Sequence, residues 1–170
     1  MKTTQDNADL IMVARHIQWM FFDVDGVMTD GGLYYDAHGE ALKRFNALDG
    51  HGLKALQAAG IGVGILSGRS HPAVEARGRE LGLGPILLGR QNKLEAFETW
   101  CASSHVPAVH CGHMGDDLPD LAVMAKVGLS ASVCGAHPEV LAAARWVSTV
   151  PGGHGAVREL CDFILRSRGG

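Results

Sequence analysis

Two short acidic clusters in this sequence could carry chemistry. Asp23 and Asp25 follow the apolar run Trp19–Phe22, and Asp116–Asp120 holds three carboxylates in five residues. Gly26 lets the chain turn directly after Asp25, so that both carboxylates can approach one site. A carboxylate at the buried end of a strand needs a cation or hydrogen bonds to compensate for burial. Oxygen ligands at this density, without matching lysines, indicate Mg²⁺, with Asp23 as candidate nucleophile and Asp25 as candidate acid/base.

A second set of residues could bind an oxyanion. Ser67-Gly68-Arg69 offers a hydroxyl and then an amide that no side chain shields, an arrangement suited to a phosphate near a helix N-terminus. Lys93 opens a predicted helix, where a cation is disfavoured unless it meets an anion. Plainer interpretations stay open at this point: Ser67 as a cap of the helix near Pro72, Lys93 as a solvated lysine, and Arg69 as a surface arginine.

The elements that must position these residues alternate between strands and helices. The predicted strands are Ile17–Phe22, Ile61–Leu66, Ile86–Leu88, Ala108–Met114, Val127–Val133 and Trp146–Val147. The predicted helices are Gly52–Ala59, Pro72–Leu81, Lys93–Ser103, Leu118–Lys126, Pro138–Ala144 and Ala156–Arg166. This order predicts a single α/β domain over residues 1–170, a mostly parallel, Rossmann-like sheet with helices on both faces. Ligands bind at the carboxyl ends of such strands, where Asp23, Ser67, Gly89 and Gly115–Asp117 are expected to converge. Turn signals within Gly31–Asn46 predict a β-hairpin after the first strand.

The order of these motifs resembles a known family. DxD after the first strand, SGR after the second, a lone lysine and then GDDxxD is the motif series of the haloacid dehalogenase-like phosphohydrolases, and the resemblance runs from Trp19 onward. It implies that Asp23 forms an aspartyl-phosphate while Asp25 protonates the leaving oxygen and later activates water. The implied phosphate-binding groups are Ser67, Gly68, Arg69 and Lys93. The implied Mg²⁺ ligands are Asp23, Asp116 and one backbone carbonyl, that of Val24 or, as the alternative, that of Asp25. Asp117 and Asp120 are implied to orient these ligands without binding the ion themselves.

Within that family, the chain resembles the minimal-cap group of 3-deoxy-D-manno-octulosonate 8-phosphate phosphatases. The stretches FFDVDGVMTDGGLYY, GRQNKLEAF and GGHGAVREL carry this resemblance. It implies a sugar-acid phosphate as substrate, or another small phosphometabolite such as a nonulosonate 9-phosphate. It also implies a homotetramer in which neighbouring subunits cover each active site, with residues 31–46 as the flap and residues 152–170 as a tail and helix. Leu48 and His154 stand where the group usually has basic residues near the sugar.

The composition limits which partners and which cellular location are expected for the protein. The chain has 170 residues, 46% hydrophobic and 19% charged, with a net charge of -3 and no basic stripe, so a nucleic-acid partner is not expected. No apolar run is long enough for a signal peptide or a membrane span, and a cytoplasmic location is the expectation. The four cysteines (Cys101, Cys111, Cys134 and Cys161) are expected to be buried, reduced thiols.

Several rival interpretations are weaker. A zinc site at His105, His110, Cys111 and His113 is disfavoured, because His110 and Cys111 would face opposite ways along a strand; His113 is instead expected at the pocket rim. Asp25 argues against a dehalogenase, and the missing large cap argues against a mutase. A non-catalytic binding domain would typically have lost a ligand, whereas this chain has every motif residue. A phospho-receiver domain is rejected because DxD comes first.

Overall fold

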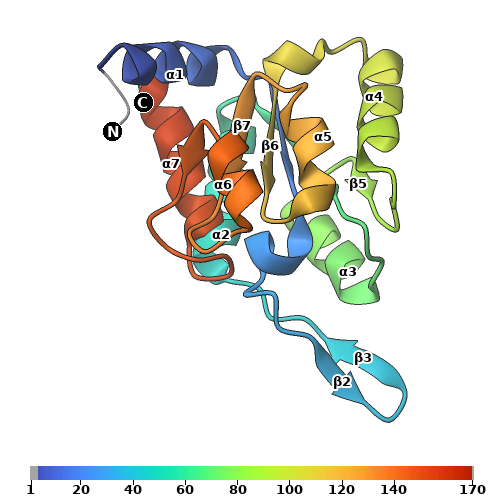
Figure 1. Cartoon of the computed structure of the whole chain (residues 1–170). Helices are drawn as coiled ribbons and strands as arrows, with labels where there is room; N and C mark the ends of the chain where they lie inside the picture. Colours follow the sequence, from blue (N-terminus) through green and yellow to red (C-terminus); the bar gives the residue numbers. More distant parts are fainter. Residues whose placement is uncertain (1–3, 170) are drawn as a thin grey trace.

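The structure, a computed structural model, describes residues 4–169 of the chain. In these residues six parallel strands form one sheet in the order β5-β4-β1-β6-β7-β8 (Figure 1). Their bounds are β1 (Trp19–Phe22), β4 (Gly62–Leu66), β5 (Ile86–Leu87), β6 (Cys111–Gly115), β7 (Leu129–Ser132) and β8 (Trp146–Val147). The predicted α/β fold with a parallel sheet is confirmed.

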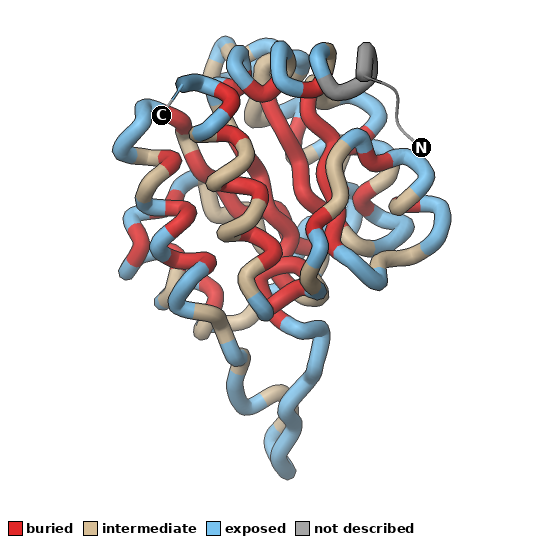
Figure 2. The backbone as a smooth tube through the Cα atoms, turned by 90° about the vertical axis from the view of Figure 1, so that its left-hand side faces the viewer, coloured by how far each residue is buried: buried red, intermediate tan, exposed pale blue. Residues whose placement is uncertain are grey.

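Helices cover both faces of the sheet because side chains alternate along each strand. In β1, Met20 and Phe22 pack on the side of α1 (Thr4–His16), α2 (Ala47–Ala58), α3 (Pro72–Leu81) and α7 (Ala156–Ser167). Phe21 points the other way, toward α4 (Lys93–Ser104) and α5 (Leu121–Met124), beside which lies α6 (Pro138–Ala143). Figure 2 shows the buried strands between these two helical layers, whose helices combine buried and exposed residues. The sheet is thus a rigid base whose carboxyl edge presents the polar residues.

Some predicted bounds were wrong for local reasons. Helix α2 begins at Ala47 rather than Gly52, because the Asn46 side chain accepts the Leu48 N–H as a cap that the two glycines of this helix had obscured. The expected helix Leu118–Lys126 divides into a 3₁₀ turn, η3 (Leu118–Asp120), and the short α5. Ala108–His110 is another 3₁₀ turn, so His110 lies outside the strand predicted over Ala108–Met114. Helix α1 was not predicted.

The predicted hairpin is present as β2 (Tyr34–Asp36) and β3 (Gly39–Leu42). It projects from the carboxyl edge of the sheet and is largely exposed (Figures 1 and 2). Tyr34 and Tyr35 do not pack inside the hairpin, since they are 41% and 63% exposed, and Leu42 is 51% exposed. An apolar surface of this kind on a thin extension suits contact with another protein surface.

The segment that begins at Gly152 packs against the turn that follows β1. Gly153 donates its N–H to the Val27 carbonyl at 3.1 Å, and its own carbonyl accepts the Asn46 side chain at 3.1 Å. A Cβ atom at Gly152 would collide with the Gly26 carbonyl. These residues therefore support the chain's own site, and the expected reach of this segment into a neighbouring subunit stays a prediction.

The cysteines differ in burial. Cys111 and Cys161 are buried as expected, and burial raises the pKa of the Cys111 thiol to about 12. Cys101 is only half-buried and Cys134 is exposed, so the prediction of four buried thiols was wrong for these two. Cys134 is exposed because it comes directly after Val133 in the loop between β7 and α6, outside the sheet. In the part of the chain that the structure describes, no helix is long and apolar enough to cross a membrane.

Candidate active site

A cavity of about 300 Å³ opens at the carboxyl ends of β1, β4 and β6. It contains the residues that the sequence predicted would converge: Asp23 after β1, Ser67 after β4 and Asp116 after β6. The full lining is Asp23, Asp25, Gly26, Gly31, Ser67, Gly68, Arg69, Arg90, Gln91, Lys93, Asp116, Asp117, Pro119 and Asp120. The candidate catalytic, phosphate-binding and metal-binding residues other than Val24 therefore line one cavity, whereas Gly89 and Gly115, which were also expected to converge here, are outside its lining.

Asp23 is held at the floor of this cavity by two donors. Its Oδ1 atom accepts the Val24 N–H at 2.7 Å, and its Oδ2 atom accepts from Lys93 Nζ at 2.7 Å. Asp23 is 8% exposed, and burial together with repulsion from Asp120 raises its pKa to about 6, although Lys93 acts in the opposite direction. The carboxylate is thus fixed in orientation and incompletely neutralised.

Lys93 is the first residue of α4 and is 4% exposed, so it is not a solvated lysine. Its ammonium group also donates to Asp120 Oδ1 at 2.7 Å. Burial lowers the pKa of Lys93, but the two carboxylates outweigh this and raise it. One cation therefore serves two acids.

Asp120 is fully buried and accepts four hydrogen bonds. His113 Nε2 lies 2.7 Å from Oδ1, and Oδ2 accepts the backbone N–H groups of Asp116 and Asp117 at 3.2 and 3.4 Å. Burial raises the pKa of Asp120, but His113 and Lys93 reverse this and hold it well below its usual range. The expectation of His113 at the pocket rim was wrong: it is fully buried, because the strand directs its ring inward to Asp120. Asp120 orients the loop and Lys93.

Asp116 completes a group of three acids with Asp23 and Asp120, in which carboxylate oxygens approach within 4.8 Å of one another. Burial and then the charges of Asp23 and Asp120 raise the pKa of Asp116 to about 7. Since the oxygens of Asp120 already accept four donors, Asp23 and Asp116 are the acids with capacity for a cation. Asp117 is exposed and caps η3 by accepting the Leu118 N–H at 2.8 Å.

The turn after Asp23, η1 (Val24–Met28), directs Asp25 toward the cavity. The Val24 carbonyl accepts the Thr29 N–H at 3.0 Å and lies 3.4 Å from the Thr29 hydroxyl, and Val24 is buried. Because the Val24 carbonyl already accepts hydrogen bonds from Thr29 within the turn, the structure disfavours it as a metal ligand. The alternative ligand is the Asp25 carbonyl. The sequence predicted a turn at Gly26, but not the hydrogen bond from Thr29 to the Val24 carbonyl.

Gly26 is required twice in this turn, because its φ of +84° suits only glycine and because a Cβ atom would collide with the Asp116 carboxylate. We expect Gly26→Ala to lower turnover at least tenfold and to destabilise the fold by about 2 kcal/mol or more. Gly135→Ala is the matched control, since Gly135 has φ +86° and open space around it. Its stability loss measures backbone strain alone, and equal losses of stability and turnover for both variants would contradict the collision.

Ser67, Gly68 and Arg69, three of the phosphate-binding candidates, line the same cavity as the acids. Ser67 is buried, and its Oγ accepts the Arg69 N–H at 3.3 Å, which leaves the hydroxyl hydrogen available. The motif is not at a helix N-terminus as predicted, because α3 begins only at Pro72, capped by His71. Instead, the loop before α4 supports it: the Arg90 N–H donates to the Ser67 carbonyl at 3.0 Å, and Gln91 Nε2 donates to the Gly68 carbonyl at 3.1 Å.

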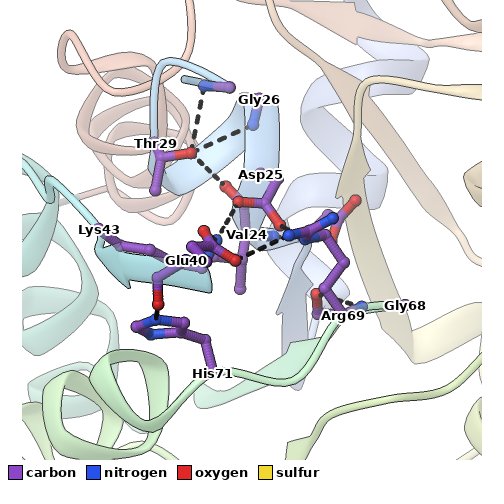
Figure 3. A network of polar contacts seen from close by, with 12 residues as sticks. Val24, Asp25, Gly26, Thr29, Glu40, Lys43, Gly68, Arg69 and His71 are labelled. Carbon is purple, nitrogen blue, oxygen red and sulfur yellow. Dashed lines mark hydrogen bonds and ion pairs between the residues drawn. The ribbon is translucent and has the colours of Figure 1, made fainter. Parts of the chain in front are cut away.

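Asp25 meets side chains that sequence reasoning missed. Lys43, just after β3, donates to Asp25 Oδ1 at 2.6 Å, and Glu40 bonds both Lys43 and Arg69 (Figure 3). Arg69 Nε also lies 3.5 Å from Asp25 Oδ2. The available signal was the pair of charged residues in the stretch GEALK, Glu40 within β3 and Lys43 just after it. Arg69 therefore lines the cavity and is not a surface arginine without contacts to the site.

Comparison with known proteins supplies the family. No family model matches the chain. A 3-deoxy-D-manno-octulosonate 8-phosphate phosphatase KdsC of Escherichia coli is 41% identical over 163 residues, which are 96% of this chain and 87% of the relative. The chain belongs to the 3-deoxy-D-manno-octulosonate 8-phosphate phosphatase family. The predicted identity as a haloacid dehalogenase-like phosphoric monoester hydrolase is thereby confirmed.

Solved structures of the family superpose closely on this chain. A haloacid dehalogenase superfamily hydrolase of Legionella pneumophila has a TM-score of 0.94 at 39% identity and covers 97% of this chain and 91% of its own. The family's phosphatase from Moraxella catarrhalis, in complex with a magnesium ion, a phosphate ion and a KDO molecule, has a TM-score of 0.92 at 37% identity, with 95% and 92% covered.

Proposed function

We propose that this phosphatase is a Mg²⁺-dependent phosphomonoesterase that acts on a sugar-acid phosphate through a phosphorylated Asp23. The observation that carries the proposal is the placement of Asp23. Its carboxylate is oriented by Lys93 and the Val24 N–H in the same cavity as Ser67, Asp25 and Asp116. Phosphoryl transfer needs such alignment and charge neutralisation more than it needs covalent chemistry from other groups.

The acids fit a magnesium ion. Asp23 and Asp120 share the Lys93 ammonium group, whereas Asp116 has no ion-pair partner among the described residues. Burial and then repulsion between the acids raise the pKa values of Asp23 and Asp116, so the group lacks positive charge. Asp23, Asp116 and the Asp25 carbonyl would hold the ion, and oxygen donors are what Mg²⁺ prefers. When bound, Mg²⁺ supplies positive charge that neutralises a phosphoryl group. The M. catarrhalis relative contains this ion.

Each residue of the cavity then has its own role in the reaction. An Asp23 oxygen forms a bond to phosphorus as the bond to the leaving oxygen breaks, and Asp25 gives that oxygen a proton. Asp25 next takes a proton from the water that hydrolyses the aspartyl-phosphate. Ser67 and the Gly68 N–H bind phosphoryl oxygens, while Lys93 neutralises charge beside Asp23.

The family relatives favour 3-deoxy-D-manno-octulosonate 8-phosphate as the substrate. The alternative is another small acid phosphate such as a nonulosonate 9-phosphate. It stays open because Leu48, which is exposed and apolar, stands where the group usually has a basic residue near the sugar. The open cavity and the exposed hairpin support the further proposal that neighbouring subunits of a homotetramer cover the site. Light scattering tests it, and a fully active monomer would rule it out.

The deciding experiment measures phosphate release from a panel of sugar and sugar-acid phosphates, with Mg²⁺ and with a chelator. Release that requires Mg²⁺ and is fastest with the octulosonate 8-phosphate is the expected result. A different preferred phosphate would retain the mechanism and reassign the substrate. No release from any compound by folded protein would refute the enzymatic proposal.

Arg90 gives a prediction about the substrate side of the site. Among the described cations that line the cavity, Arg69 and Lys93 are paired with carboxylates, whereas the exposed Arg90 guanidinium has no such partner. A charged hydrogen bond to an anionic substrate is worth about 1.5–3 kcal/mol. We therefore expect Arg90→Gln to lower kcat/KM about 10- to 100-fold, and Arg79→Gln, an exposed arginine on α3, to leave it unchanged. Equal values for both variants would contradict this role.

A further inference from the structure

The hairpin, although largely exposed, is fastened to the catalytic site at its base. Lys43 binds Asp25 after β1, Glu40 binds Arg69 after β4 at 2.7 Å, and His71 binds the Glu40 carbonyl at 3.1 Å (Figure 3). His71 Nδ1 accepts the Ala73 N–H, so Nε2 is the nitrogen that donates to Glu40. Three contacts to two segments, the turn after β1 and the loop between β4 and α3, therefore determine where β3 lies.

Lys43 is the centre of this attachment. Its side chain is 1% exposed, and its ammonium group contacts two carboxylates, Asp25 Oδ1 and Glu40 Oε1, each at 2.6 Å. A lysine is buried so fully only when it is paired, because an unpaired buried charge is very unfavourable. The pairing indicates that the position of Lys43 is specific to Asp25 rather than incidental.

The two oxygens of Asp25 consequently differ. Oδ1 faces Lys43, whereas Oδ2 is buried, accepts no hydrogen bond among the described residues and has the Arg69 Nε atom only at 3.5 Å. A carboxyl group with one oxygen fixed by an ammonium group cannot rotate freely, so the other oxygen has a defined direction. Asp25 also lines the cavity, where a leaving oxygen would lie.

We propose that Lys43 is a positioning residue for proton transfer: its bond to Asp25 Oδ1 holds the Asp25 carboxyl group in one orientation for the proton exchanged with the substrate. Glu40 assists by holding Lys43 and Arg69 in place. The proposal rests on the proposed function. In the first step the Asp23–phosphorus bond forms, the phosphorus–oxygen bond of the ester breaks, and the proton on the Asp25 carboxyl group moves to the leaving oxygen. In the second step the Asp25 carboxylate takes a proton from the attacking water.

The test compares two esters that differ in their need for a proton. The alkoxide leaving group of a sugar phosphate must be protonated, whereas the aryl leaving group of 4-nitrophenyl phosphate departs without it. Since kcat/KM ends at the first irreversible step, it reports transfer to Asp23 and not the later hydrolysis. Lys43→Met is expected to lower kcat/KM about 100-fold for the sugar phosphate and less than about 5-fold for the aryl ester. Lys43→Arg should restore part of the sugar phosphate activity.

Glu40→Gln and Lys54→Met complete the experiment. Glu40→Gln leaves Lys43 in the chain, keeps the side-chain shape, and should lower sugar phosphate activity about tenfold with the same sparing of the aryl ester. Lys54 is an exposed lysine on α2, and its variant should match wild type. Equal losses on both esters for Lys43→Met and Glu40→Gln, or no loss on either, would overturn the proposal. Wild-type protein that released no phosphate from either ester would instead refute the proposed function.

Discussion

Replacing Asp23 with Asn is expected to lower metal-dependent phosphate release by on the order of 10⁴-fold or more, because no other residue can take over as nucleophile. The amide cannot form the acyl phosphate, yet it retains the shape of the carboxylate. The fold should persist, since Asp23 is a buried acid whose pKa is raised to about 6 and whose charge therefore does not favour the folded state. Phosphate release and circular dichroism, measured on the same preparation, check both statements.

A matched control separates this effect from the loss of any carboxylate. Asp162 on α7 pairs with Arg158 at 2.8 Å and lies away from the cavity. Asp162→Asn should release phosphate at the wild-type rate. Substantial turnover by Asp23→Asn would show that Asp23 is not the nucleophile, whereas loss of turnover in both variants would point to a general effect on folding.

Sequence reasoning succeeded where a topological rule fixed the position of a side chain. Asp23, Ser67 and Asp116 each follow an apolar run, and the carboxyl ends of parallel strands meet at one edge of the sheet. No side-chain contact had to be known to place them together. The same rule located the loop after β5, whose Arg90 and Gln91 support Ser67 and Gly68.

The missed features depend on contacts between segments distant in sequence. Lys43 meets Asp25 only because the hairpin folds back over the end of β1, and no periodicity encodes that angle. His113 was misplaced at the rim because its partner, Asp120, comes from the next turn and directs it inward. The Val24 carbonyl was chosen from family resemblance, while the hydrogen bond to Thr29 that occupies it is a property of one unusual turn.

The charge balance of the site unites these observations. Lys93 neutralises Asp23 and Asp120 together, Lys43 and Arg69 neutralise Asp25 and Glu40, and Asp116 has no cation of its own in the described structure. The deficit of positive charge is therefore concentrated at Asp23 and Asp116, the acids proposed to bind Mg²⁺. Asp25, the acid proposed to transfer protons, has no such deficit. This separation lets metal binding and proton transfer proceed on different sides of the same turn.

The deficit should make stability depend on pH and on metal. Asp23 and Asp116 have pKa values raised from 3.8 to about 6 and about 7, so the folded state holds their protons more tightly than the unfolded state does. Their contribution to the free energy of unfolding is complete below about pH 4 and is lost as pH rises through 6 and 7. Without metal, the protein should lose stability between about pH 4 and pH 7, and the stabilisation by Mg²⁺ should grow over the same interval.

Asp116→Asn isolates one of these groups. At pH 8 without metal, the variant should be more stable than wild type by on the order of 2 kcal/mol, which corresponds to a Tm higher by roughly 4–8 °C. At pH 4, where the wild-type carboxyl is protonated, the two proteins should melt together. The variant should also gain little from Mg²⁺ at pH 8. Thermal melts over pH 4–8, with Mg²⁺ and with chelator, provide the comparison. A variant less stable than wild type without metal at pH 8 would mean that Asp116 is not an uncompensated charge, because its removal would then have cost a favourable interaction.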